Sequence, residues 1–104
     1  MNYQDKAKKI VFDYVKPRLE KTDRHVTFVQ DEIYVVWFSK TLQNWKALLS
    51  TTLPDGMYYE VTYDGEKQRT YLDAYKKFDN VCITDDEWYE TLTADQLRDF
   101  DLKR

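Results

Sequence analysis

The sequence predicts a small α+β domain. In it, a three- to four-stranded antiparallel meander packs against an N-terminal helix and a second helix, in the order α-β-β-β-α, with a short helical C-terminal extension. Three observations predict this fold. Apolar residues recur at helical spacing between residues 7 and 15, strand-like alternation runs from 57 to 63, and turn sequences at 54–56 and 64–65 separate the extended stretches.

The first helix carries one apolar stripe formed by Ala7, Ile10, Val11, Tyr14 and Val15. Residues spaced three and four apart lie on the same side of a helix, so this stripe faces a core. Pro17 lacks an amide donor and crowds the preceding turn. We therefore expect the helix to end or kink near residues 14–16, with a short continuation through Leu19 as the alternative.

Two strands are expected before the first tight turn. Between residues 32 and 40, Ile33, Val35 and Trp37 form one alternating set and Tyr34, Val36 and Phe38 the other. Because both sets are apolar, we expect a central strand covered on both faces. Residues 43–52 fit either a helix or a strand, and the ending Ser50-Thr51-Thr52 before Pro54 favours a strand.

The segment after the first tight turn predicts a further strand and then the second helix. Pro54-Asp55-Gly56 is a typical turn sequence, and Asp64-Gly65 is a strong hairpin signal. Between them, inward residues alternate with outward ones; the inward set is Met57, Tyr59, Val61 and Tyr63. A helix over residues 70–78 is predicted from a shared helical face formed by Tyr71, Leu72, Tyr75 and Phe78.

The last quarter of the chain contains two capping-box patterns, Thr84-Asp85-Asp86-Glu87 and Thr93-Ala94-Asp95-Gln96. They predict helices over roughly residues 85–92 and 94–101, anchored to the body by Trp88, Tyr89, Leu92, Leu97 and Phe100. We therefore divide the chain into an α+β core domain, residues 1–83, and an acidic helical extension, residues 84–104, packed on the same domain.

Charge is distributed unevenly along the 104 residues, whose net charge is −3. Residues 79–104 carry 3 basic and 8 acidic residues, a net of −5, which leaves +2 for residues 1–78. The single cysteine, Cys82, lies in an apolar triplet and is expected to be a buried, inert thiol in a reducing, cytoplasmic protein. The longest apolar run, residues 33–38, is too short to cross a bilayer, so no membrane partner is expected.

No residue pattern predicts a reaction. His25 and Cys82 are single residues of their kind without ligand spacing, and helix capping already accounts for the acidic run at 85–87. Both glycines, Gly56 and Gly65, belong to turns rather than to a phosphate-binding loop. We therefore expect no catalytic residues, no metal, no cofactor and no enzymatic activity.

The aromatic content predicts a binding protein. Three tryptophans and nine tyrosines are more than a small core readily covers, and such residues dominate protein interfaces. The candidate contact residues are the exposed members of Trp45, Lys46, Tyr58 and Trp88. A protein partner of unknown identity is expected, and the chain itself is expected to be a monomer or a small homo-oligomer.

Nucleic-acid binding is the alternative, because the predicted order of elements is also that of a double-stranded-RNA-binding domain. The basic residues that would line one edge are Lys40, Lys46, Lys67, Arg69, Lys76 and Lys77. They are interspersed with carboxylates, however, and phosphate binding normally requires a clustered basic excess. A nucleic-acid-binding or replication-associated accessory protein is therefore the second expectation.

The stretch from Tyr34 to Leu48, the segment from Pro54 to Tyr63, and the segment from Tyr71 to Ile83 together resemble a family of small uncharacterised proteins encoded by bacteriophages and prophages of Gram-positive bacteria. The resemblance covers roughly residues 5–83 and brings no catalytic residues. It implies expression in the host bacterial cytoplasm. Such proteins often bind and redirect host machinery, so the resemblance implies a non-enzymatic phage accessory protein, for example an inhibitor of host defence.

Overall fold

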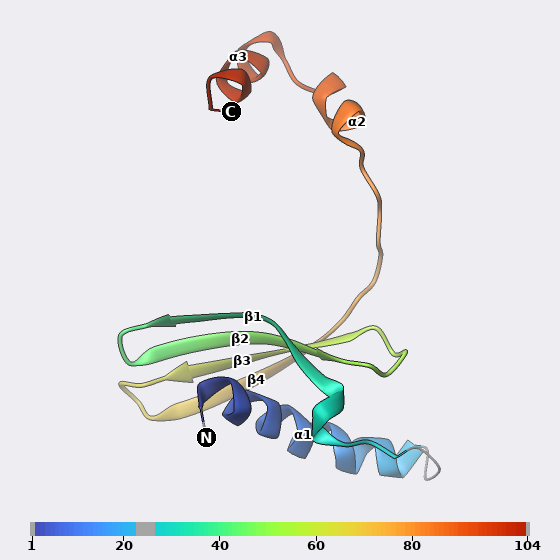
Figure 1. Ribbon diagram of the computed structural model, residues 1–104, viewed down its shortest axis with the longest axis vertical. Helices are drawn as coiled ribbons and strands as arrows, with labels where there is room; N and C mark the ends of the chain where they lie inside the picture. Colours follow the sequence, from blue (N-terminus) through green and yellow to red (C-terminus); the bar gives the residue numbers. More distant parts are fainter. Residues whose placement is uncertain (1, 23–26, 104) are drawn as a thin grey trace.

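The computed structural model describes the backbone of residues 2–22 and 27–103, with side chains except at 20, 22 and 100–103. Helix α1 (Tyr3–Thr22) and a 3-10 turn, η1 (Gln30–Glu32), precede four strands: β1 (Ile33–Thr41), β2 (Asn44–Thr51), β3 (Met57–Asp64) and β4 (Arg69–Lys76). Two short helices, α2 (Asp85–Glu90) and α3 (Ala94–Lys103), follow. The strands form one antiparallel sheet in the order β1-β2-β3-β4, which confirms an α+β fold (Figure 1).

Helix α1 continues through Pro17 to Thr22, so the predicted end near residues 14–16 was wrong. Pro17 is exposed, and the helical hydrogen bond that it removes would have ended on the carbonyl of Asp13, also exposed. The Arg18 guanidinium donates to the Tyr14 carbonyl oxygen at 2.7 Å and so satisfies a second acceptor in the same turn.

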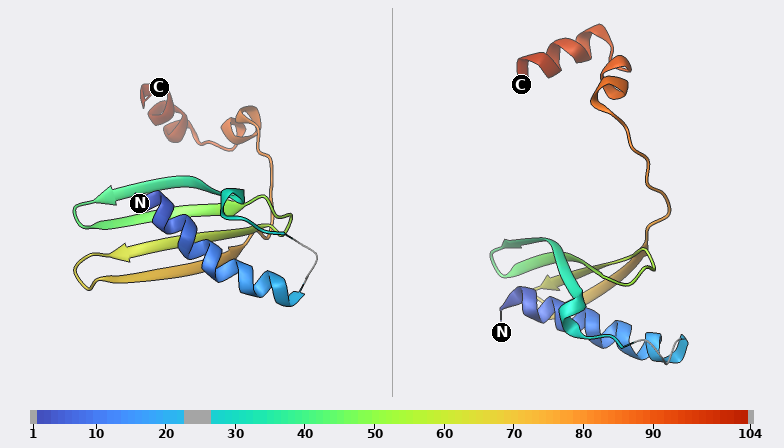
Figure 2. Two further views of the ribbon diagram at one scale, coloured as in Figure 1. Left: turned by 60° about the horizontal axis from the view of Figure 1, so that its bottom comes forward. Right: turned by 45° about the vertical axis from the view of Figure 1, so that its right-hand side comes forward.

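The core lies between α1 and one face of the sheet, which the helix crosses diagonally (Figure 2). Ala7 and Val11 of α1 are fully buried against the strands, as the apolar stripe predicted. The other buried apolar residues are Val15, Phe28, Ile33, Trp45, Ala47, Leu49, Tyr59 and Val61. We call this side of the sheet the covered face.

Strand β1 lies at an edge of the sheet, so the predicted central position was wrong. Its register with β2 shifts between Val35 and Trp37, a β-bulge that leaves Val36 without a partner. The extra residue puts Phe38 on the same face as Val35 and sends Trp37 to the opposite face. The apolar residues on both sides of β1 are therefore not buried on two faces. One side faces the core, and the other forms an exposed aromatic surface after the bulge.

Residues 44–51 form strand β2, which resolves the choice between helix and strand in favour of the strand. The predicted turn and strand that follow are confirmed. The Asp55 carboxylate accepts from the Met57 amide at 3.0 Å, and Gly56 adopts a φ of +68° that favours glycine. Tyr59 and Val61 of β3 then point into the core, as their alternation predicted.

Residues 69–76 form strand β4, so the predicted helix over residues 70–78 was wrong. The spacing of Tyr71, Leu72 and Tyr75 suits one helical face, but it also suits a strand with tyrosines on one face and Leu72 on the other. The hairpin after Asp64 decides the outcome, because it places this segment in continuous register with β3 from Asp64 opposite Arg69 to Met57 opposite Lys76. Pairing with β3 therefore overrides the helical pattern.

Residues 77–103, which we call the C-terminal arm, extend from β4 to the side of the sheet opposite α1 (Figure 1). The second capping box is confirmed in full, since the Thr93 amide donates to Gln96 Oε1 and the Gln96 amide to Thr93 Oγ1. The predicted packing of this extension on the body was wrong: Trp88 is 42% exposed, and the described parts of α2 and α3 stand apart from the sheet in Figure 1. The side chain of Phe100 lies outside the described residues.

Cys82 belongs to the extended part of this arm and is exposed, contrary to the buried thiol that its apolar neighbours predicted. Its neighbours Val81 and Ile83 are exposed as well, at 68% and 63%. An apolar triplet is buried only when a second element covers it, and no described element packs over this one.

Candidate functional site

The face of the sheet opposite α1, which we call the open face, carries exposed aromatic side chains from both edge strands. Tyr34 and Trp37 come from β1 and are 47% and 41% exposed, whereas Tyr71 and Tyr75 come from β4 and are 46% and 52% exposed. Tyr71 and Tyr75 share this face because strand residues alternate between faces, and Tyr34 and Trp37 share it because the bulge adds one residue between them. Aromatic groups thus border this face along its two edges.

The register places these residues in rows that cross the sheet. Three rows follow from the strand pairings: Tyr34, Ser50, Tyr58 and Tyr75; Trp37, Leu48, Glu60 and Asp73; and Ser39, Lys46, Thr62 and Tyr71. Each row begins or ends with an aromatic residue on an edge strand. The two central strands contribute mostly polar or half-buried side chains.

An ion pair occupies the centre of the open face. Lys46 Nζ of β2 lies 3.3 Å from Glu60 Oε1 of β3. The Glu60 side chain is 23% exposed and the Lys46 side chain 45%, so the pair is accessible and screened by solvent. A polar centre bordered by aromatic groups can both hydrogen-bond to a partner and exclude water around that contact.

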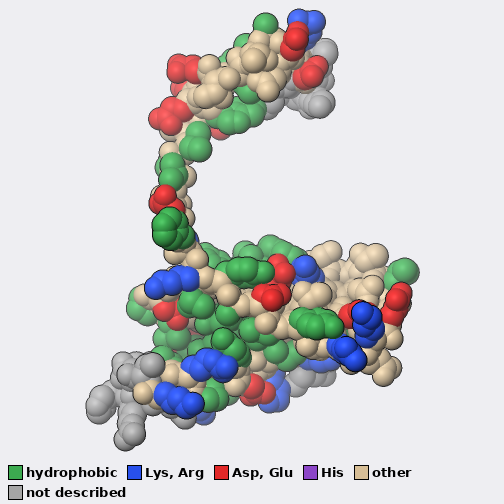
Figure 3. All heavy atoms as spheres, turned by 180° about the vertical axis from the view of Figure 1, so that it is seen from behind, with side chains coloured by type: hydrophobic (Ala, Val, Ile, Leu, Met, Phe, Trp, Pro, Cys, Tyr) green, Lys and Arg blue, Asp and Glu red, His purple; other side chains and the backbone are tan. Residues whose placement is uncertain are grey.

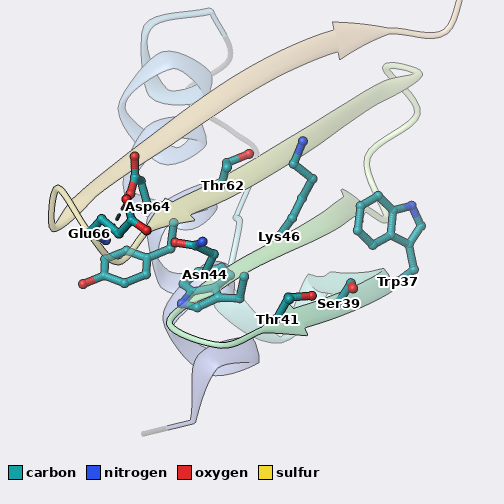
Figure 4. A pocket seen from close by; sticks show the side chains of 10 residues that line it. Trp37, Ser39, Thr41, Asn44, Lys46, Thr62, Asp64 and Glu66 are labelled. Carbon is teal, nitrogen blue, oxygen red and sulfur yellow. Dashed lines mark hydrogen bonds between the residues drawn. The ribbon is translucent and has the colours of Figure 1, made fainter.

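A shallow hollow of about 620 Å³ lies at one end of this face, toward the β3–β4 turn (Figure 4). The Trp37 side chain stands at one side of the hollow, and Asp64 and Glu66 stand at the other. Between them, small hydroxyl and amide groups line its floor: Ser39, Thr41, Asn44 and Thr62. The Asn44 side chain is held there by accepting from the Gly65 amide at 2.8 Å.

Close contact between two turns holds this end of the sheet together. A β-carbon on Gly65 would lie 2.3 Å from the Gln43 carbonyl oxygen, which is closer than van der Waals contact permits. Glycine is therefore required where the β3–β4 turn touches the β1–β2 turn. This contact gives the hollow a rigid wall.

The structure separates the four predicted contact residues. Lys46 and Tyr58 lie on the open face, in different rows. Trp45 is only 3% exposed and contacts Tyr3, Phe38 and Tyr63 in the core, so it is not an exposed member of this set. Trp88 lies in the C-terminal arm and does not join the other residues.

Sequence reasoning missed the aromatic residues that border the open face. Trp37 was expected to be covered, because its strand was predicted to be central with both faces buried, and nothing in the sequence marks the one-residue bulge before it. Tyr71 and Tyr75 were assigned to a helix. The alternation Tyr71, Asp73, Tyr75 was the available signal, since a charged residue between two tyrosines indicates a solvent-exposed strand face.

The basic residues named for the nucleic-acid alternative do not share one surface. Lys46 and Arg69 belong to the open face, but Lys46 pairs with Glu60, and Arg69 lies opposite Asp64. Basic and acidic side chains are also interspersed over the body when it is viewed from behind (Figure 3). Lys76 and Lys77 lie on β4 and directly after it, rather than on the helix that the comparison with an RNA-binding domain required.

The clearest pKa shift belongs to a core residue rather than to the open face. Burial under α1, together with the Asp55 carboxylate, raises the pKa of the Tyr59 hydroxyl to about 12. Within residues 2–22 and 27–103 there is no group of three histidine, cysteine or acidic residues placed to hold a metal ion. His25 lies outside the described residues.

Comparison with known protein families shows to which family the chain belongs. The model of a family of unknown function, DUF6275, matches residues 4–85, and the chain belongs to this family. The match covers α1, the whole sheet and the first residues of the C-terminal arm. Comparison with curated proteins and with solved structures gave no match. In the part of the chain that the structure describes, no helix has the length and apolarity to span a membrane.

Proposed function

We propose that this DUF6275 protein is a non-enzymatic binding module whose open face docks on a protein partner. One observation carries the proposal: four large aromatic side chains, Tyr34, Trp37, Tyr71 and Tyr75, are each 41–52% exposed along the borders of a sheet face that no helix covers. Tyrosine and tryptophan supply large contact area at a small entropic cost. Such residues are concentrated at protein interfaces.

The composition of the open face supports a protein partner over a nucleic acid. Its central cation, Lys46, already pairs with Glu60, and its border carries Asp64, Asp73 and Glu66 as well as Arg69. A phosphate backbone requires uncompensated positive charge. A protein partner with both polar and apolar groups on its surface is instead complementary to the open face, which has aromatic borders around a polar centre.

The biological setting is part of the proposal and rests on the resemblance to phage-encoded proteins. In that setting the protein acts in the host bacterial cytoplasm as a phage accessory protein. It would work by occupying a functional surface of a host or phage macromolecule. One example of such an activity is the inhibition of a host defence protein.

Affinity capture from host lysate with matched variants tests the proposal. The open-face variant is Trp37→Ala combined with Tyr71→Ala. The control is Phe78→Ala, which removes an aromatic side chain that is fully exposed at 101% but lies beyond the sheet, in the C-terminal arm. We expect the wild type and the control to retain the same partner, and the open-face variant to lose at least tenfold in affinity, as hot-spot substitutions do.

Two further arms separate the alternatives. Capture is repeated after nuclease treatment, and binding of the purified partner is measured between 50 and 200 mM salt, over which nucleic-acid affinity falls by roughly a thousandfold or more for proteins with many phosphate contacts. Capture that is lost on nuclease treatment would favour the nucleic-acid alternative. Loss of binding in Phe78→Ala but not in the open-face variant would move the site to the C-terminal arm and overturn the proposal.

A further inference from the structure

Strand β4 lies at an edge of the sheet, and alternate residues direct their backbone amide and carbonyl groups away from β3, where another strand could accept and donate hydrogen bonds. The Lys77 amide donates to the Gly56 carbonyl at 2.7 Å, which extends the β3–β4 ladder beyond the pair of Met57 and Lys76. In an antiparallel ladder, hydrogen-bonded residues alternate with residues whose amide and carbonyl point away from the partner. Counting back from Lys77, the β4 residues whose backbone groups point outward are Lys76, Ala74, Leu72 and Thr70.

The two edges of the sheet differ in their protection against pairing. The bulge at Val36 interrupts β1, and bulges are one means by which proteins prevent edge strands from pairing. Strand β4 has no bulge, its sequence from Arg69 to Lys76 contains no proline, and α1 packs chiefly against β1, β2 and β3. A straight, exposed edge of this kind is a template for another strand.

We propose that β4 pairs with β4 of a second copy, antiparallel and across a two-fold axis at Leu72. The axis of such a pair stands perpendicular to the sheet and passes midway between the two copies of one residue, so that residue faces its own counterpart. With the axis at Leu72, the outward-facing backbone groups of Thr70 meet those of Ala74 in the second copy, and residues 69–75 of each strand are paired. This inference rests on the edge alone and is independent of the proposed function.

The charge pattern along β4 selects this register. An axis at Asp73 would place two aspartates opposite each other, which is unfavourable. An axis at Tyr71 would pair only residues 69–73. The axis at Leu72 instead places Tyr71 opposite Asp73, places Arg69 opposite Tyr75, and brings Arg69 diagonally next to Asp73 of the second copy. Within its own sheet Asp73 lies opposite another carboxylate, Glu60, so a cation supplied across the edge is favourable.

Pairing of this kind would produce one continuous sheet from two chains. A two-fold axis perpendicular to the sheet keeps the two open faces on one side and both α1 helices on the other. Tyr71 and Tyr75 of both copies would then lie along the centre of a single aromatic surface. The dimer is therefore a wider docking surface than the single chain.

Proline substitution on the outward set is the first test, with the full chain examined by sedimentation equilibrium. Ala74→Pro removes an amide that faces away from β3, so the β3–β4 ladder keeps its hydrogen bonds while pairing with a second copy is blocked. Ala74→Ser keeps the amide and is the matched control. We expect dimers for the wild type and the control, and at least a tenfold increase in the dimer dissociation constant for Ala74→Pro, with unchanged circular dichroism.

Symmetric cross-linking tests the register itself. Paired residues that exchange hydrogen bonds have Cα atoms about 5.5 Å apart, within the range of a disulfide. In a Cys82→Ser background, which removes the single native cysteine, Leu72→Cys is expected to cross-link to itself on mild oxidation, whereas Thr70→Cys is not. A monomeric wild type at high micromolar concentration, an unaffected Ala74→Pro dimer, or equal cross-linking at 70 and 72 would each overturn the proposal.

Discussion

The two faces of the sheet are built from the same four strands but differ in how they use aromatic residues. On the covered face, Trp45 is 3% exposed and stacks on Tyr63, with ring centroids 5.9 Å apart. On the open face, Trp37 is 41% exposed and lines the hollow. The difference shows that residue type alone does not distinguish core from surface in this chain. Position relative to α1 distinguishes them.

The largest expected change in stability is the difference between two single variants, Trp45→Ala on the covered face and Trp37→Ala on the open face. Trp45→Ala should lower the free energy of unfolding by about 3 to 5 kcal/mol, because it leaves a cavity among several aromatic rings. Trp37→Ala should lower it by about 1 kcal/mol or less, since exposed residues contribute little. Urea unfolding followed by circular dichroism measures both. Equal losses would mean that the open face is also part of the core.

The variant Pro17→Ala tests how strongly α1, the helix on the covered face, stabilises the fold. Alanine restores the amide that α1 lacks in its interior, where proline costs up to about 3 kcal/mol. Part of that gain is offset because alanine also gives the unfolded chain more freedom. We expect an increase in stability of about 1 to 2 kcal/mol in urea unfolding. A decrease would show that Pro17 is needed to fit α1 to the sheet.

The Tyr59 hydroxyl makes the covered face sensitive to alkaline pH. Its pKa is about 12 in the folded chain and about 10 when unfolded, so the folded state binds the proton more tightly between these values. The resulting stability is present below pH 10 and is lost as the pH rises toward 12, amounting to about 1 kcal/mol between pH 9 and 11. Tyr59→Phe should show a shallower decline than the wild type over this range. The surface variant Tyr75→Phe is the control and should follow the wild type.

The smallest effect is expected for removal of α2 and α3. A chain that ends after Ile83 should unfold cooperatively, with a free energy within about 0.5 kcal/mol of the full chain, because neither helix packs on the sheet. Differential scanning calorimetry measures this. Loss of the cooperative transition would show that the arm stabilises the sheet in solution.

The parts of the fold that were predicted correctly are those encoded locally. The β3 strand follows from the alternation of Tyr59 and Val61, and the turn before it follows from Pro54 and Gly56. The errors involve segments whose local pattern fits more than one structure. The β4 segment carries a pattern compatible with helix and strand, and only its pairing with β3 selects the strand.

Less of the candidate site was predictable. Lys46 and Tyr58 were named as candidate contact residues and lie on the open face, and their contact with a partner stays a prediction. Trp45 was selected as a contact residue because exposure cannot be inferred from residue type. The exposure of Trp37 depends on a bulge that shifts the register by one residue, and no residue of β1 has a conformational preference that announces it.

The extended stretch between the sheet and α2 acts as a tether. Residues 77–84 span at most about 27 Å when fully stretched, so α2 stays within that radius of the end of β4. A partner held by the sheet would therefore meet the acidic helices at an effective concentration in roughly the millimolar range. Even a weak second contact from Trp88 would then slow the partner's release, giving avidity without enlarging the folded body.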